Sequence, residues 1–229
     1  MEKELSYLGK KYYSLPSNKC VEESKSLIII MSTHNQKDRY FLFNKISECT
    51  ERSSDVIFVT DPKNSYYLDS DDGKGYFSFF EYLIKDYDPI NVSLFGTSMS
   101  GYAALLFSRM IGCNAIVNNP QVNLNESYAF AWPALKNTLS NVCSLDISIS
   151  DYEKKPGSCF VVYGEHAMDK MNKKLLDASS NLFDTYISRG ILDKSHGFYF
   201  EVVEDIFEIN SLILKFNDVK LIKVDKLKY

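Results

Sequence analysis

The sequence VSLFGTSMSGYAALL, residues 92–106, joins an apolar run to a turn of small residues and then to an Ala- and Leu-rich segment. An apolar run that passes through glycine and serine into a helical pattern predicts a strand, a tight turn and a helix. Such a turn can expose a nucleophilic serine at the end of a strand, and its usual spelling is G-x-S-x-G. Here residues 96–100 read GTSMS, so the second glycine of the pattern is replaced by serine.

Two serines in this turn compete for the role of nucleophile. The residues two before and two after a nucleophile in such a turn must be small, because the chain reverses sharply there. Around Ser98 these residues are Gly96 and Ser100, whereas two residues after Ser100 stands the bulky Tyr102. The pattern therefore favours Ser98. The alternative interpretation is a glycine- and serine-rich helix start that binds an anion and performs no catalysis.

Short apolar runs alternate with longer amphipathic segments along the rest of the chain, without an internal repeat. This alternation predicts βαβ units and a mainly parallel sheet with helices on both faces. We predict one domain over residues 1–229, of the α/β class, with the three-layer sandwich of an α/β hydrolase. The expected strands are residues 26–31, 55–60, 91–95, 114–119, 158–164 and 185–192, an edge hairpin over 4–15 precedes them, and the amphipathic segments are 39–46, 76–87, 99–111, 171–183 and 198–216.

Composition excludes several classes of partner. Of the 229 residues 45% are hydrophobic and 24% charged, as in ordinary globular proteins, and the net charge of −4 offers no footprint for nucleic acid. The amino terminus lacks the apolar stretch of a secretory signal, and the longest apolar run, residues 27–31, is too short to span a bilayer. We therefore expect a cytoplasmic protein without an integral membrane segment.

The sequence predicts no metal site. Its five cysteines, at positions 20, 49, 113, 143 and 159, are odd in number and contain no C-x-x-C pair, so we expect small buried residues rather than disulfides or zinc ligands. Residues 68–75, LDSDDGKG, have acidic spacing faintly like that of a calcium loop but lack its distal glutamate. We interpret them as a solvated turn.

A nucleophilic serine needs a base, and in this type of fold the acid and then the histidine follow the serine along the chain. The chain has three histidines. His34 precedes Ser98, and His166 comes directly after the strand 158–164, where the acid is expected. His196, in the segment KSHGFYF, stands between the last expected strand and the last expected helix, so it is the predicted base.

The acid is expected just after the strand 158–164, in the segment GEHAMDK. Its task is to orient the imidazole and to stabilise its charged form. Asp169 is far enough beyond the strand to turn back toward the histidine, whereas Glu165 continues the strand direction. We favour Asp169 and keep Glu165 as the alternative.

An acyl-transfer site also needs main-chain donors for the oxyanion. One N–H is expected from Met99, the residue after the nucleophile. The second is expected from the loop STHNQ that follows the first long apolar run, with Ser32, Thr33 or His34 as the donor. His34 could equally contact substrate or be an ordinary loop residue.

The segments GTSMSGYAALL, NNPQVNL, VVYGEHAMDKMN and SHG together resemble a known family. They are similar to the α/β-hydrolase-fold O-acetyltransferases of bacterial capsules and surface polysaccharides, such as that of meningococcal serogroup A, and more distantly to accessory Sec system proteins. The resemblance implies that acetyl-CoA acetylates Ser98 and that a sugar hydroxyl then takes the acetyl group. It also implies that His196 is the base in both steps and that Asp169 orients it.

Three polar residues in the segment NNPQ are candidate substrate contacts. Asn118, Asn119 and Gln121 follow a strand and could hydrogen-bond a sugar, although turns after strands use the same residue types for structural reasons. The first functional hypothesis is thus an O-acetyltransferase with no bound cofactor, which uses acetyl-CoA as donor and a carbohydrate as acceptor. The alternatives are an esterase or deacetylase with the same acyl-serine intermediate, and a non-catalytic partner in glycan assembly or secretion.

Overall fold

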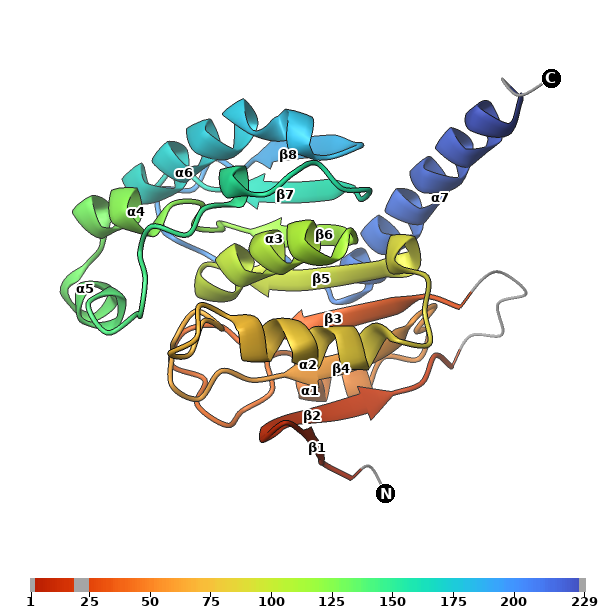
Figure 1. The fold of residues 1–229 in the computed structure, drawn as a ribbon, viewed down its shortest axis with the longest axis horizontal. Helices are drawn as coiled ribbons and strands as arrows, with labels where there is room; N and C mark the ends of the chain where they lie inside the picture. Colours follow the sequence, from red (N-terminus) through yellow and green to blue (C-terminus); the bar gives the residue numbers. More distant parts are fainter. Residues whose placement is uncertain (1–2, 19–24, 227–229) are drawn as a thin grey trace.

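The computed structural model describes residues 3–18 and 25–226 and centres on one eight-stranded sheet (Figure 1). The strand order is β1-β2-β4-β3-β5-β6-β7-β8. The first two strands form an antiparallel hairpin on the edge, and β2 pairs antiparallel with β4, whereas all pairs from β4 to β8 are parallel. The strands are β1 (Leu5–Tyr7), β2 (Lys10–Leu15), β3 (Leu27–Met31), β4 (Asp55–Val59), β5 (Val92–Thr97), β6 (Asn114–Asn118), β7 (Cys159–Tyr163) and β8 (Tyr186–Gly190).

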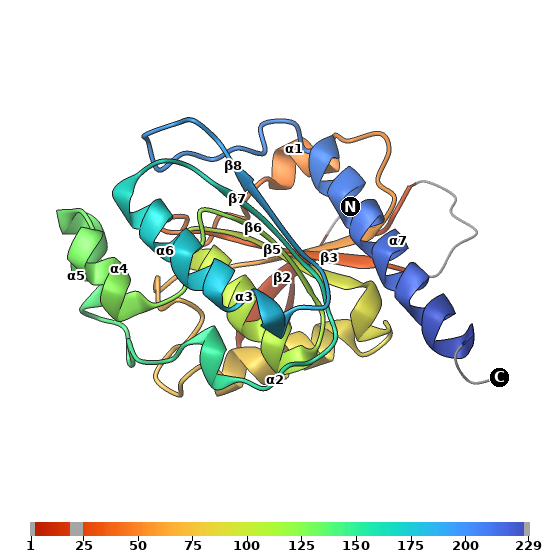
Figure 2. The ribbon, with the colours of Figure 1, turned by 90° about the horizontal axis from the view of Figure 1, so that it is seen from above.

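Helices cover both faces of the sheet, which confirms the predicted three-layer α/β fold. Figure 2 shows α2, α3 and α6 on one face and α1 and α7 on the other. Each face has its own apolar core, and β3, β5 and β6 are buried throughout because they contribute side chains to both cores. The helices are α1 (Phe43–Ser47), α2 (Lys74–Ile84), α3 (Met99–Ile111), α4 (Leu124–Phe130), α5 (Pro133–Leu139), α6 (Ala167–Ala178) and α7 (Glu204–Lys226).

Two helices begin elsewhere than the sequence pattern predicted. Helix α6 starts at Ala167 rather than near residue 171, because the His166 side chain accepts a hydrogen bond from the main-chain N–H of Met168 and so caps the helix. Helix α7 starts at Glu204 rather than 198. Residues 198–203 have no helical structure. Phe200 and Val203 instead pack into the core on the face of the sheet that α1 and α7 cover.

The long helix α7 is fastened to the amino ends of the strands by buried amides. The Asn210 side chain bonds with the hydroxyls of Ser93 and Ser54, at 2.5 and 3.1 Å. Two turns further on, Asn217 accepts from the Ser158 hydroxyl at 2.9 Å. These contacts hold the middle of α7 near the amino ends of the strands, away from the carboxyl ends, where parallel sheets bind their ligands.

Two minor expectations can be compared with the structure. Cys49, Cys113 and Cys159 are buried, as predicted. The prediction was wrong for Cys143, which is exposed. Cys20 lies outside the described residues. Within the segment 68–75, residues 69–73 form a turn and residues 74 and 75 already belong to α2. Within the described part of the chain, no helix is both long and apolar enough to cross a membrane.

Candidate active site

Ser98 occupies a strained turn between β5 and α3. Its φ of 51° and ψ of −112° lie outside the regions that ordinary residues prefer. The turn is possible because Gly96 has no side chain: a Cβ there would lie 2.2 Å from the carbonyl oxygen of Ser100. At Gly101 a Cβ would lie 2.9 Å from Cα of Pro120, so this glycine lets the helix approach the end of β6.

The second serine of the turn has a structural contact. Ser100 is fully buried, and its hydroxyl accepts from the main-chain N–H of Thr97 at 3.0 Å and lies 3.1 Å from the Thr97 carbonyl oxygen. Tyr102, whose size argued against Ser100 as nucleophile, is also fully buried and donates to the carbonyl of Ile147. Ser98 by contrast is only partly buried. The turn therefore presents Ser98 and hides Ser100.

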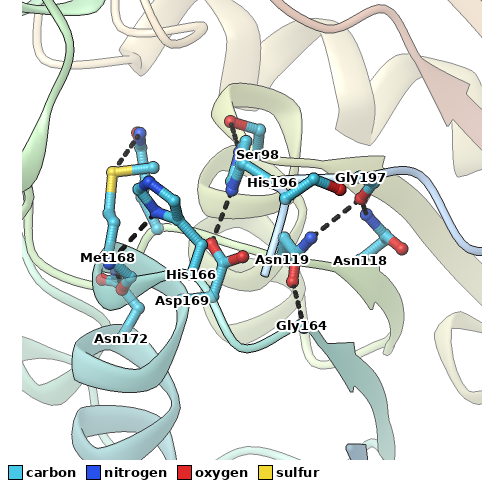
Figure 3. Close-up of polar contacts among 12 residues, drawn as sticks. Ser98, Asn118, Asn119, Gly164, His166, Met168, Asp169, Asn172, His196 and Gly197 are labelled. Carbon is cyan, nitrogen blue, oxygen red and sulfur yellow. Dashed lines mark hydrogen bonds and ion pairs between the residues drawn. The ribbon is translucent and has the colours of Figure 1, made fainter. Parts of the chain in front are cut away.

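Three predicted residues from distant parts of the chain form a continuous line of hydrogen bonds (Figure 3). His196 Nε2 lies 2.8 Å from Ser98 Oγ, and His196 Nδ1 lies 2.5 Å from Asp169 Oδ1. Because a carboxylate only accepts, Nδ1 carries the proton and the lone pair of Nε2 faces the serine hydroxyl. This arrangement can remove the proton from Ser98 and hold the resulting imidazolium against a buried carboxylate.

The position of the acid follows from the early start of α6. Asp169 lies in the first turn of this helix, is 1% exposed, and benefits from the positive end of the helix dipole. Glu165, the alternative acid, instead pairs with Lys170 at 3.0 Å near the surface. The structure therefore brings Asp169 to His196 and turns Glu165 toward Lys170.

Candidate oxyanion donors lie on both sides of Ser98. Met99 is the first residue of α3, so its N–H has no partner within the helix. In the loop after β3, the Ser32 N–H donates to the Val59 carbonyl at 3.0 Å, which leaves the N–H groups of Thr33 and His34. The Thr33 hydroxyl donates to the carbonyl of Thr97 at 2.8 Å and so ties this loop to the residue before Ser98.

The His34 side chain points to α5 rather than to the serine. Its Nε2 lies 2.7 Å from the hydroxyl of Thr138, which joins the loop after β3 to the α4–α5 segment. Burial lowers the pKa of His34 below its ordinary value of 6.5, because the charged imidazolium is poorly solvated there. The neutral ring is thus the form that the fold favours.

The burial of His34 predicts a pH effect on stability. Below pH 6.5 the unfolded chain protonates His34 before the folded chain does, so stability should fall as the pH drops through this value and on through the lowered pKa. A His34→Gln variant keeps a polar side chain but cannot titrate. Urea unfolding of both proteins between pH 7 and 5 should therefore show the parent losing stability faster. Equal losses in the two proteins would contradict the lowered pKa of His34.

The three residues expected to contact the substrate are buried in the structure. Asn118, Asn119 and Gln121 are at most 1% exposed. Both asparagine amides donate to the carbonyl of Gly197, and Gln121 Nε2 lies 3.8 Å from the sulfur of Met168. The loop that carries His196 covers Asn118 and Asn119, and Gln121 lies beside Met168, so the structure does not leave these three side chains open to a sugar.

Two residues beside the site were given no catalytic or binding role from the sequence. Trp132 is 39% exposed, and its ring centroid lies 5.5 Å from that of His196. The ring centroids of His166 and His196 lie 6.0 Å apart. Trp132 stands in the segment between β6 and β7, and no local pattern in that segment indicates that it folds toward Ser98.

His166, Asp169 and His196 are also the one group in the described residues whose side chains could together hold a metal ion. Their ligand atoms lie within 4.8 Å of one another. The donor set is poorly suited to a resident metal, since His196 and Asp169 are bonded to each other and His166 Nδ1 caps α6. The arrangement fits proton transfer better than metal binding.

A mainly parallel sheet with helices on both faces, and a serine turn after β5, define the α/β-hydrolase fold. Solved structures of this fold are similar to the chain. One is the capsule O-acetyltransferase of Neisseria meningitidis serogroup A, at 16% identity and a TM-score of 0.63, with 93% of each chain covered. A mutant of that enzyme in complex with CoA is equally similar, at 15% identity and a TM-score of 0.63, over 93% of this chain and 94% of the other.

Two further structures broaden the comparison. The fluorophosphonate-binding serine hydrolase FphF of Staphylococcus aureus matches at 14% identity and a TM-score of 0.59, over 93% of this chain and 98% of the other. The glycosylation-associated Gap123 complex of Streptococcus agalactiae matches at 13% identity and a TM-score of 0.63, over 96% of this chain and 46% of the other. No protein-family model matches the sequence, and no curated protein sequence does.

Proposed function

We propose that the protein is a serine-dependent acyltransferase that moves an acetyl group from acetyl-CoA to a hydroxyl of a bacterial surface glycan or its precursor. The observation that carries this proposal is the line of hydrogen bonds from Ser98 through His196 to Asp169. It is the arrangement that activates a serine for attack on an acyl group. The likeness to the capsule O-acetyltransferase supports transfer, and the CoA bound to its mutant supports the donor.

In the first step His196 Nε2 takes the proton of Ser98 as Oγ attacks the thioester carbonyl. The oxyanion is held by the N–H of Met99 and by one from the loop after β3. When the tetrahedral intermediate collapses, the C–S bond breaks and the CoA thiolate takes the proton from His196. Ser98 then carries the acetyl group as an ester.

In the second step the acceptor hydroxyl gives its proton to His196 Nε2 and attacks the acetyl carbonyl of Ser98. The bond to Oγ breaks, and the proton returns from His196 to Ser98. Asp169 stays ionised throughout and stabilises the imidazolium that forms in each step. Because acetyl-CoA is an intracellular donor, this proposal includes a cytoplasmic location.

A hydrolase is the second candidate, because water can resolve the same acetyl-Ser98 intermediate. The likeness to a serine hydrolase over 98% of that chain favours it. A non-catalytic role in glycan assembly or secretion, as the likeness to the Gap123 complex suggests, fits less well with a complete Ser–His–Asp line.

One experiment separates the three functions. The protein is incubated with acetyl-CoA or with p-nitrophenyl acetate, and its mass is followed with and without added glycan fragments. An acetyl adduct from acetyl-CoA that glycan removes supports transfer, whereas an adduct formed from the ester alone, or lost at the same rate without glycan, supports hydrolysis. If neither reagent gives an adduct and the Ser98→Ala variant behaves like the parent, both enzymatic proposals fail.

A further inference from the structure

The segment NNPQ contains a clamp on the loop that carries His196. We propose that Asn118 and Asn119 are positioning residues, which hold this loop against the end of β6 and thereby align His196 with Ser98. The inference rests on the proposed function in so far as His196 is the base that activates Ser98. It gives the two asparagines a role in the mechanism without contact to the substrate.

Both amide groups meet at one atom. Asn118 Nδ2 donates to the carbonyl of Gly197 at 2.9 Å, and Asn119 Nδ2 donates to the same oxygen at 2.8 Å (Figure 3). Gly197 directly follows His196. Two donors on one carbonyl oxygen use both of its lone pairs, so the main chain beside the histidine is fixed in direction as well as in distance.

The other atoms of these amides reach two further parts of the site. Asn118 Oδ1 accepts from the N–H of Tyr199 at 3.0 Å, two residues beyond Gly197. Asn119 Oδ1 accepts from the N–H of Gly164 at 2.8 Å, at the end of the strand that leads to Asp169. The clamp thus connects the histidine loop to the segment that carries the acid.

Asn118 also contacts the serine turn. The main-chain carbonyl of Asn118 accepts from the Ser98 N–H at 3.0 Å, and Asn118 Nδ2 is 3.0 Å from the hydroxyl of Thr97. A displacement of Asn118 would therefore move both partners of the Ser98–His196 bond. The three segments that the mechanism requires meet at these two side chains.

The residue types fit this role. Asn119 has a φ of 42°, a left-handed conformation that asparagine tolerates better than most residues other than glycine. Aspartate would accept from Gly164 but could not donate to Gly197. Residues 191–203, which contain His196, have neither helix nor strand. Main-chain bonds hold Ile191 and Asp193 to the end of β7, and side-chain contacts such as those of the two asparagines hold the segment beyond them.

The test measures the reactivity of Ser98 independently of the natural substrate. A fluorophosphonate labels an activated serine covalently, and its rate constant is compared among the parent, Asn118→Ala and Asn119→Gly. We expect each variant to be labelled about 10- to 100-fold more slowly, because a small misplacement of a catalytic group has effects of this size. Glycine is used at position 119 since it accepts the positive φ.

Asn114 provides a matched control at the other end of β6. It is also fully buried, and its amide donates to the carbonyls of Ile90 and Val92 at 2.7 and 3.0 Å and accepts from Ser158 N–H. An Asn114→Ala variant should lose thermal stability as the clamp variants do but keep the labelling rate of the parent. Equal slowing in all three variants would show a general loss of stability and overturn the inference.

A double-mutant cycle separates positioning from any other role. In a His196→Ala background, Asn119→Gly should slow labelling by less than twofold, since its effect in the parent acts through the histidine. An undiminished effect in that background would overturn the inference. So would labelling of Asn118→Ala and Asn119→Gly at the parental rate. A parent that is not labelled at all would instead contradict the proposed function, so the two failures can be distinguished.

Discussion

Replacing Ser98 with alanine should lower the rate of p-nitrophenyl acetate cleavage by about 10⁴-fold or more, because removing the nucleophile of such a site has an effect of this order. The variant should fold normally, since the main-chain contacts of the turn do not involve Oγ. The measurement is the steady-state rate of p-nitrophenol release, with circular dichroism as the check on folding.

Ser100→Ala is the control for this experiment. The Ser100 hydroxyl contacts only the main chain of Thr97, so its loss should cost about 1 kcal/mol of stability and change the rate by only a few fold. If the two alanine variants lost activity equally, activity would depend on the structure of the turn and not on the Ser98 hydroxyl.

Replacing Asp169 with asparagine should have the second-largest effect. Asparagine keeps the shape of the side chain, but its NH₂ group can donate to His196 Nδ1 and so favour the tautomer with the proton on Nε2. That tautomer cannot accept the proton of Ser98, and we expect a loss of about 10⁴-fold in kcat with little change in KM, as for the corresponding change in serine proteases.

Glu165→Gln is the matched variant for the acid. Glu165 stands four residues earlier and pairs with Lys170 instead of His196, so its change should leave kcat within about twofold of the parent. A large loss in Glu165→Gln together with a small loss in Asp169→Asn would reverse the assignment of the acid.

The sequence was sufficient to predict the fold class and to single out Ser98 and His196, which the structure brings within hydrogen-bond distance. Apolar strands alternating with helices leave few arrangements for a sheet, and the order of residues in this fold left one histidine to test. The sequence favoured Asp169 over Glu165 as the acid but did not decide between them, because the position of the acid depends on where α6 begins. The cap that His166 provides moves this start toward β7, and it sets the direction in which Asp169 points.

Long-range burial explains what the sequence could not predict. Asn118 and Asn119 look like exposed residues of a turn until the loop of His196, about 80 residues further along the chain, is known to cover them. Trp132 approaches His196 only because the α4–α5 segment folds back toward the serine, with His34 bonded to Thr138. None of these contacts leaves a local pattern in the chain.

The central claim is that Ser98 is the nucleophile that His196 activates, and mapping of the covalent adduct tests it most directly. The protein is treated with a fluorophosphonate, digested and examined by mass spectrometry. We predict one adduct, on Ser98, which the Ser100→Ala variant retains and which forms far more slowly in His196→Ala. An adduct on another residue, or labelling of Ser98→Ala at the parental rate, would contradict the account.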